Sequence, residues 1–387
     1  MGAGFRVGTI LGIPIRIDYS WLIIFAILVF ALTANFAHML PGLAFPVAVV
    51  LGLVTALLFF GSVLAHELMH SVVARAKGLP VAGITLFIFG GVSQLEEEPA
   101  SPRIEFEMAV VGPLTSLALA VLFFLAWMAA SPARPHTLAD YFRIVPAAGI
   151  QSSAGAVFHY LAVINLFLAI FNLAPGLPLD GGRLLRAVIW HFSRDLRAAT
   201  RVATGTGQLL GYLLIGLGIL TFLAGNAGGI WYAFIGWFLL QAAQQAYQQM
   251  LFRSALAGVS VGALARRDAL AVPPHLSIQN LVDDYLLRYA ANVFPVVEGD
   301  RVVGTVGMNE IHHAPRDEWP ITPVSRVMRP VTADEVVSEK LDAWDAVQRL
   351  GHSECECLLL IDDGKLDGIV TRDSLLRWLH TQRQLRT

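Results

Sequence analysis

The sequence has few charged residues. Asp, Glu, Lys and Arg make up 14% of its 387 residues, whereas hydrophobic residues make up 56%. A soluble domain usually carries about 25% charged residues, so this composition is typical of a membrane protein. The charge is also uneven, since residues 1–253 hold 13 Lys/Arg and 10 Asp/Glu, and the shorter remainder holds 14 and 19. The sequence therefore predicts an apolar domain at 1–253 and a polar domain at 254–387.

Other features that the sequence lacks exclude further classes of protein. A net charge of only −2 gives no reason to expect a nucleic-acid partner. Two cysteines, Cys355 and Cys357, are too few for a disulfide framework or a zinc site of their own, so we expect reduced thiols. The N-terminus lacks a long apolar run with a small-residue cleavage site, so no removable signal peptide is expected.

Long apolar windows, by contrast, are abundant. Six of them have about the length that crosses a bilayer, and they cover residues 20–39, 45–74, 105–130, 155–174, 203–224 and 229–252. The basic, amphipathic segment LLRAVIWHFSRDLRAATRV between the fourth and fifth windows predicts a surface helix. The apolar domain is thus expected to be an α-helical polytopic membrane protein with six transmembrane helices.

Basic residues near the ends of these windows predict the orientation. With six spans both termini share one side of the membrane, and most basic residues fall on that side: Arg6, Arg16, Arg75, Lys77, Arg103, Arg183, Arg186, Arg194, Arg197, Arg201 and Arg253. The opposite side receives Arg134 and Arg143. Cytoplasmic loops carry an excess of Lys and Arg. We therefore expect a multi-pass plasma-membrane protein whose two termini and polar domain are cytoplasmic.

Three ionisable residues interrupt the second span. His66, Glu67 and His70 follow a stretch, 47–64, that has no charge. Positions i and i+4 lie on one face of a helix, so both imidazoles can reach one metal ion while Glu67 lies beside them as a general base. This H-E-x-x-H spacing is that of zinc metalloproteases. A charge at mid-bilayer costs roughly 2.5–3.5 kcal/mol. A catalytic use is therefore favoured over the alternative, a polar network that locks helices together.

A catalytic zinc ion needs a third protein ligand and one open position for water. His159 lies near the outer end of the fourth span, far from the two histidines, whereas Asp180 follows the cytoplasmic end of that span at a matching depth. The intervening PGLP sequence breaks the helix. Broken backbone at membrane depth is tolerated where protein buries it or water reaches it. Asp180 is thus the predicted third ligand, and the alternative is a helix cap.

These motifs resemble those of the site-2 proteases, which are intramembrane zinc metalloproteases. The resemblance rests on HELMH and on the later N-x-x-P-x-x-P-L-D-G pattern at 172–181, and GIPIRIDYSW, FGGV and VGP extend it over residues 1–253. It implies one zinc ion bound by His66, His70 and Asp180, a water activated by Glu67, and a substrate carbonyl or oxyanion held by Asn172. The implied substrate is the transmembrane segment of a single-span membrane protein, cleaved in regulated intramembrane proteolysis.

The resemblance also implies a small membrane-associated β-sheet. VGTILGIPIRI and ITLFIFGGVSQL have the alternating or β-branched character of its strands. An edge of the sheet can pair with an unwound substrate as an added strand; the alternative is a covering hairpin without substrate contact. Some relatives carry a PDZ domain after the third span, but the loop at about 131–154 is too short for one.

The polar domain repeats itself with a shift near 64 residues. VVEGDRVVGTVGMNEI at 296–311 aligns with LIDDGKLDGIVTRDSL at 360–375, and each unit predicts helix, strand, turn, strand and helix. This resembles a cytoplasmic α+β tandem CBS domain, with repeats at about 254–317 and 318–387. CBS modules often bind adenine nucleotides.

The nucleotide signature of such modules, G-h-h-T/S-x-x-D, is intact in neither repeat. The second repeat has Gly368 and Thr371, but Ser374 replaces the aspartate and Asp373 stands one residue early. Thr371 can still bond a phosphate, and Asp373 a ribose. Two roles stay open, namely nucleotide binding and a structural role that joins two chains as a homodimer.

Two functions other than a protease modulated by its CBS pair are compatible with the same residues. One is a CBS-regulated membrane metal transporter that carries its metal on His66, His70 and Asp180. The sequence shows no inverted halves with paired broken helices, and a transporter has no need of Glu67. The other is a binding or scaffold protein without activity, against which the intact motifs argue. A zinc metalloendopeptidase is the favoured prediction.

Overall fold

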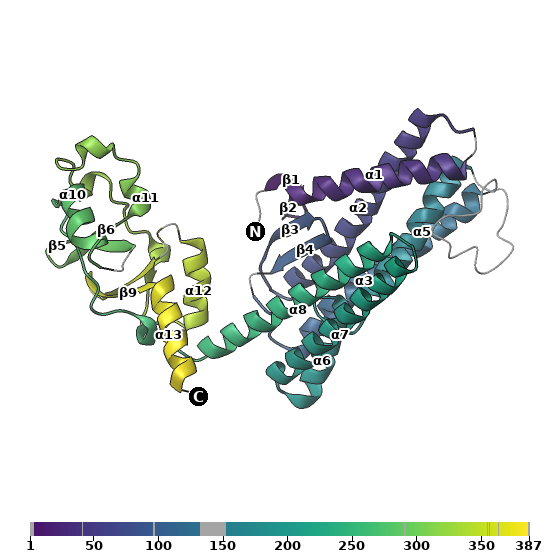
Figure 1. The fold of residues 1–387 in the computed structure, drawn as a ribbon. Helices are drawn as coiled ribbons and strands as arrows, with labels where there is room; N and C mark the ends of the chain where they lie inside the picture. The colour runs from purple at the N-terminus through teal and green to yellow at the C-terminus, as the bar shows by residue number, and fades with distance from the viewer. Residues whose placement is uncertain are drawn as a thin grey trace. The chain divides into compact units, whose positions relative to one another are not determined.

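The computed structural model describes residues 4–40, 42–95, 97–131, 152–289, 292–353, 355, 357–362 and 364–385. The chain divides into two compact units, Met1–Met250 and Leu251–Thr387 (Figure 1). Arg134 and Arg143, which entered the orientation argument, lie outside the described residues, as does most of the loop between the third and fourth predicted spans.

Long apolar helices build the first unit. Within the described residues, five helices are long and apolar enough to cross a membrane: α1 (Tyr19–Met39), α2 (Phe45–Ala76), α3 (Pro102–Ala130), α5 (Ser153–Asn172) and α7 (Leu196–Leu223). They expose many large apolar side chains, for example Phe30 at 77% and Leu223 at 75%. Such a surface is suited to lipid, because a water-soluble monomer seldom exposes large contiguous apolar patches.

The sixth predicted span forms a helix but is not among these five. It is α8 (Gly229–Leu256), 28 residues long. Its second half carries glutamines at 241, 244, 245, 248 and 249, which lower its apolar character. The helical membrane region is thus shown, and the count of six spans stays a prediction.

The prediction of one surface helix over 184–202 is wrong. The chain instead forms α6 (Asp180–Ser193), turns at Arg194 with a left-handed φ of 55°, and begins α7 at Leu196. Asp195 caps α7, because its Oδ1 accepts from the backbone N–H groups of residues 197 and 198 at 2.8 and 3.1 Å. This cap starts a new helix where the amphipathic pattern alone suggested a continuous one.

A four-stranded sheet accompanies the helices of the first unit. Its strands are β1 (Gly4–Ile10), β2 (Ile13–Asp18), β3 (Val81–Phe87) and β4 (Gly90–Leu95), in the order β1-β2-β3-β4. The two hairpins are antiparallel, and β2 pairs with β3 in parallel. The two segments expected to supply strands therefore form one sheet. Its free edges are β1, which is exposed throughout, and β4, which packs against α2.

Two hairpins and several short helices form the second unit. Its elements are α9 (Val261–Leu264), α10 (Ile278–Asn280), the π-helix η1 (Leu281–Leu286), β5 (Val293–Glu298), β6 (Arg301–Gly307), α11 (Met308–Ile311), three 3₁₀ turns (Arg316–Glu318, Val324–Arg326 and Ala333–Glu335), β7 (Val336–Val337), α12 (Ala343–His352), β8 (Cys357–Asp362), β9 (Lys365–Thr371) and α13 (Arg372–Leu385). The sequence repeat is also a structural repeat, because Val296 pairs with Gly304 as Leu360 pairs with Gly368. Each hairpin shifts register directly after that pair.

Candidate metal centre

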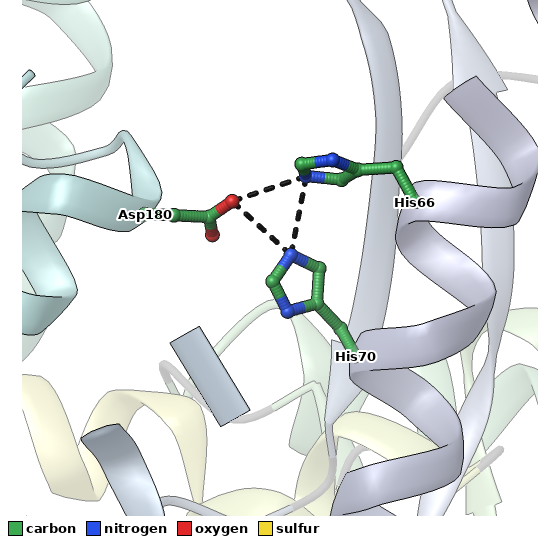
Figure 2. A group of neighbouring side chains, drawn as sticks. All are labelled: His66, His70 and Asp180. Atoms are coloured by element: carbon green, nitrogen blue, oxygen red, sulfur yellow. Dashed lines mark hydrogen bonds and ion pairs between the residues drawn. The ribbon is translucent and has the colours of Figure 1, made fainter. Parts of the chain in front are cut away.

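Two buried histidines and a buried aspartate meet in the first unit. His66 and His70 lie one turn apart on α2 and are each 4% exposed, and Asp180, the first residue of α6, is 8% exposed. Figure 2 shows the three side chains pointing toward one another. Together they are a group that can hold a metal ion. The structure thus brings together the three ligands that the sequence predicted.

The segment between α5 and α6 places Asp180 at this position. Its backbone is tied to α7, because the Leu177 N–H donates to the Ala203 carbonyl at 2.9 Å. A Cβ on Gly182 would lie 2.1 Å from the Leu177 nitrogen, so only glycine lets α6 begin this close to the loop. The proline and glycine residues that end α5 therefore direct the chain back toward α2.

The distances in the group fit zinc. His66 Nε2 and His70 Nε2 lie 3.0 and 3.2 Å from Asp180 Oδ2, and 3.2 Å from each other. Ligand atoms of a tetrahedral zinc site, at about 2.0–2.1 Å from the metal, stand roughly 3.3 Å apart. A single shared proton joins only two of the three atoms, whereas a cation at the centre joins all three.

The far side of each imidazole is also occupied. The Met108 carbonyl lies 2.6 Å from His70 Nδ1, and Ser116 Oγ lies 2.9 Å from His66 Nδ1. A carbonyl only accepts hydrogen bonds, so His70 Nδ1 donates and Nε2 of the neutral ring keeps its lone pair. Metal-binding histidines are commonly oriented in this way. These two contacts cannot be predicted from the sequence, because a backbone carbonyl and a lone serine form no motif.

A glycine leaves the space around the ligand atoms open. A Cβ on Gly112 of α3 would lie 2.2 Å from His70 Nε2 and 2.6 Å from His66 Nε2. The VGP segment at 111–113 is also one of the segments that carry the family resemblance. Gly112 lies directly beside the ligand atoms, and any side chain at this position would fill the space that a metal ion needs.

Glu67 is held by the sheet. Ser93 on β4 donates to Glu67 Oε2 at 3.1 Å and also lies 3.0 Å from the Glu67 carbonyl and from Ser71 Oγ. Ser93 directly follows the FGGV segment, but no motif marks it as a site residue. The edge strand β4 is thereby fixed beside the H-E-x-x-H turn of α2.

Two other candidates lie outside the group. The Asn172 side-chain amide donates to the Leu168 carbonyl of its own helix at 3.0 Å, and no hydrogen bond among the described residues links it to the histidines or Asp180. His159 is 1% exposed and packs against the Trp127 ring with centroids 4.5 Å apart. The structure therefore supports Asp180 over His159 as the third ligand.

Thr371 and Asp373 line a cavity of about 450 Å³ in the second unit, which Arg266, Arg372 and Arg377 also line. The Thr371 hydroxyl accepts from the Ser374 N–H at 3.3 Å and so caps α13. Arg266 also hydrogen-bonds Asp268 and thereby lowers the pKa of that exposed carboxyl group. Three arginine residues in the lining make the cavity suitable for a phosphate-bearing ligand.

The class of protein follows from the first unit. An aspartate 110 residues after His70 joins the two histidines of the H-E-x-x-H helix to form the candidate metal site. The helices around this site are long and apolar. This combination defines a metallopeptidase embedded in a membrane.

Comparison with known proteins identifies the family. The model of peptidase family M50 matches residues 54–214, and the CBS-domain model matches 261–317 and 324–381. A candidate zinc metalloprotease of Synechocystis sp. is 32% identical over 98% of this chain and 97% of its own. The candidate zinc metalloprotease Rip3 of Mycobacterium tuberculosis is 32% identical over 97% of this chain and 93% of its own. The solved site-2 protease from Methanocaldococcus jannaschii is 23% identical, covers 63% of this chain and 95% of its own, and has a TM-score of 0.42.

The chain belongs to peptidase family M50, the site-2 proteases, and is a metallopeptidase with tandem CBS domains. The family implies zinc as the metal. It does not favour the alternative of a metal transporter.

Proposed function

We propose that this chain cleaves the transmembrane segment of single-span membrane proteins, in regulated intramembrane proteolysis, and that its CBS pair modulates the cleavage. The observation that carries the proposal is the triangle of His66 Nε2, His70 Nε2 and Asp180 Oδ2, with sides of 3.0 to 3.2 Å, buried among apolar helices. A metal centre among such helices is suited to a peptide bond within the bilayer.

Each residue near the centre then has a distinct role. His66, His70 and Asp180 hold one zinc ion per chain. Bound zinc supplies polarisation of the scissile carbonyl and a lowered pKa of water. Glu67 takes the proton from the attacking water and later gives it to the leaving amine. Asn172 donates to the substrate carbonyl or oxyanion once its amide releases Leu168.

The sheet offers a way to present the substrate. A helical peptide bond is shielded by its own turn, so the substrate must unwind before attack. Among the described strands, one edge of β4 has no neighbour, and Ser93 on this strand contacts Glu67. An unwound segment added along β4 therefore runs beside the general base.

The proposed topology has six spans, with α8 as the sixth. Both termini and the CBS pair lie in the cytoplasm, in a protein of the plasma membrane. The basic residues near the span ends support this orientation. The proposed domains are 1–253 for the protease and 254–387 for the CBS pair, with repeats at about 254–317 and 318–387.

The CBS pair is proposed to bind an adenine nucleotide at Thr371 and Asp373. Support comes from the cavity of about 450 Å³ that these residues line together with three arginines. The other role of the pair, which joins two chains as a homodimer, is compatible with the same fold.

The test is a Glu67→Gln variant, which keeps the shape of the side chain but removes the base. We expect it to retain one zinc ion per chain in elemental analysis. Cleavage of a reconstituted single-span substrate should fall by about 10²–10⁴-fold. A variant that cleaves at the wild-type rate would refute the assignment of Glu67. Metal flux into vesicles without cleavage by either form would favour the transporter.

A further inference from the structure

Helix α3 supplies no ligand to the metal centre, yet it contacts both histidine ligands. The Met108 carbonyl accepts from His70 Nδ1, and Ser116 Oγ lies against His66 Nδ1. Met108, Gly112 and Ser116 are spaced by four residues, so they lie on one face of the helix. This face runs along the backs of both imidazoles and fixes the orientation of the rings.

The same face of α3 holds the helix that carries the third ligand. Glu105 lies about one turn before Met108 and is 0% exposed. Its Oε1 accepts from Arg186 Nε at 2.6 Å and also pairs with Arg186 Nη2. Arg186 belongs to α6, whose first residue is Asp180, and α6 packs against α3 (Figure 1). One buried ion pair therefore ties the Asp180 helix to α3.

A contribution to folding stability does not by itself explain this buried ion pair. The desolvation of two buried charges offsets their attraction, and a well-packed apolar pair is often as stable or more so. The pair is also incompletely bonded, because Glu105 Oε2 is buried without a hydrogen-bond partner in the described part of the chain. In some proteins, buried polar or charged groups instead specify one arrangement of the packed elements.

We infer that the Glu105–Arg186 ion pair is a positioning device for the metal centre, an inference that rests on the proposed zinc-binding role of the triad. The pair sets α6 against α3 so that Asp180 Oδ2 meets the two Nε2 atoms that α3 has already oriented. Helix α3 is then the common support of all three ligands. Loss of the pair displaces Asp180 and weakens metal binding although every ligand is still present.

The test compares zinc affinity in two variants of the full-length chain in detergent. Glu105→Gln keeps the size of the side chain and removes its charge. We expect its zinc dissociation constant, measured by competition with a chromophoric chelator, to rise about 10–100-fold, as for other residues that support metal ligands. The visible absorption of the Co²⁺-substituted variant should also change, because it reports the arrangement of the ligands.

The matched control is Glu107→Gln. Glu107 lies two residues further along α3 and is also ion-paired, but with Lys77 and Arg103 rather than with α6. Its zinc affinity and cobalt spectrum should stay within about twofold of the wild type. If Glu105→Gln does not fold, Arg186→Lys replaces it, because it keeps the charge but not the fork of donors, and should show a smaller rise.

The outcomes separate this inference from the proposed function. Wild-type affinity and an unchanged cobalt spectrum in Glu105→Gln, or in Arg186→Lys where Glu105→Gln does not fold, would show a merely structural pair and overturn the inference alone, even with a lowered melting temperature. A wild-type chain that binds no zinc would overturn the proposed function and this inference with it.

Discussion

At the scale of single residues, the centre depends on groups that carry no charge. Met108 contributes a carbonyl, Ser116 a hydroxyl and Gly112 only the absence of a side chain. These groups set the tautomer of His70, the orientation of both rings and the free space between the ligand atoms. A carboxylate and two imidazoles without such support would not keep their lone pairs directed at one point.

Gly112 gives the sharpest prediction at this scale. Its Cβ would lie 2.2 Å from His70 Nε2, so Gly112→Ala should displace that ring and abolish stoichiometric zinc binding in elemental analysis. Gly61→Ala on α2 is the control, because a Cβ there meets nothing within 4 Å. The control should keep its zinc and gain slightly in stability, since alanine favours a helix. Full zinc retention by Gly112→Ala would contradict the account of the free space.

At the scale of the elements, β4 joins the sheet to the H-E-x-x-H turn. Ser93 is the link, because it contacts both the carboxylate and the backbone carbonyl of Glu67. The Ser71 hydroxyl hydrogen-bonds Ser93 at 3.0 Å, and no side-chain hydrogen bond given by the described residues joins it to the Glu67 carboxylate. A strand thus contacts the carboxylate of the proposed general base, whereas the proposed metal ligands lie on helices.

Ser93→Ala should therefore separate catalysis from metal binding. Without its hydroxyl, Glu67 loses its fixed orientation, and we expect cleavage of a single-span substrate to fall about 10-fold or more, within the range for supporting residues. Zinc content should not change, because none of the Ser93 hydrogen bonds in the described structure reaches a proposed metal ligand. Ser71→Ala removes a hydroxyl that hydrogen-bonds Ser93 but not the Glu67 carboxylate, so it should leave both quantities near the wild type. A parallel loss of zinc in Ser93→Ala would show that β4 supports the whole centre.

Whether the sequence predicts a contact in the metal centre depends on how far apart in the chain the two residues lie. The pairing of His66 with His70 is local, because helix geometry alone sets positions i and i+4 side by side. Asp180 was predicted from the broken helix before it. The contacts of α3 are long-range and involve backbone or small side chains, so no spacing indicates them. The turn at Arg194 was missed because the Asp195 cap competes with an uninterrupted amphipathic pattern.

At the scale of the whole molecule, the uneven charge corresponds to two units with different chemistry. The first unit carries the metal centre, and the second carries an arginine-lined cavity and no metal-ligand group among its described residues. A nucleotide in that cavity can change the activity of the protease only if it binds two arrangements of the chain with different affinities. Binding must therefore be established before any coupling is measured.

We predict that the full-length chain in detergent binds an adenine nucleotide. Calorimetric titration with ATP, ADP and AMP should show saturable binding of at least one of them, with a dissociation constant below about 1 mM, or roughly −4.1 kcal/mol. The physical reason is the cavity of about 450 Å³, where Arg266, Arg372 and Arg377 surround Thr371 and Asp373. Arginine guanidinium groups match the geometry of phosphate oxygens.

Substitutions of residues that line the cavity test whether the heat measured in the nucleotide titration comes from binding at this site. Thr371→Ala and Asp373→Ala should each weaken the nucleotide about 10-fold, whereas Asp362→Ala, which removes a carboxylate that does not line the cavity, should have no effect. Bound nucleotide should also raise the melting temperature, because a ligand that binds only the folded state stabilises it. The absence of heat with all three nucleotides, together with a dimer in light scattering, would leave the CBS pair with the role of joining two chains.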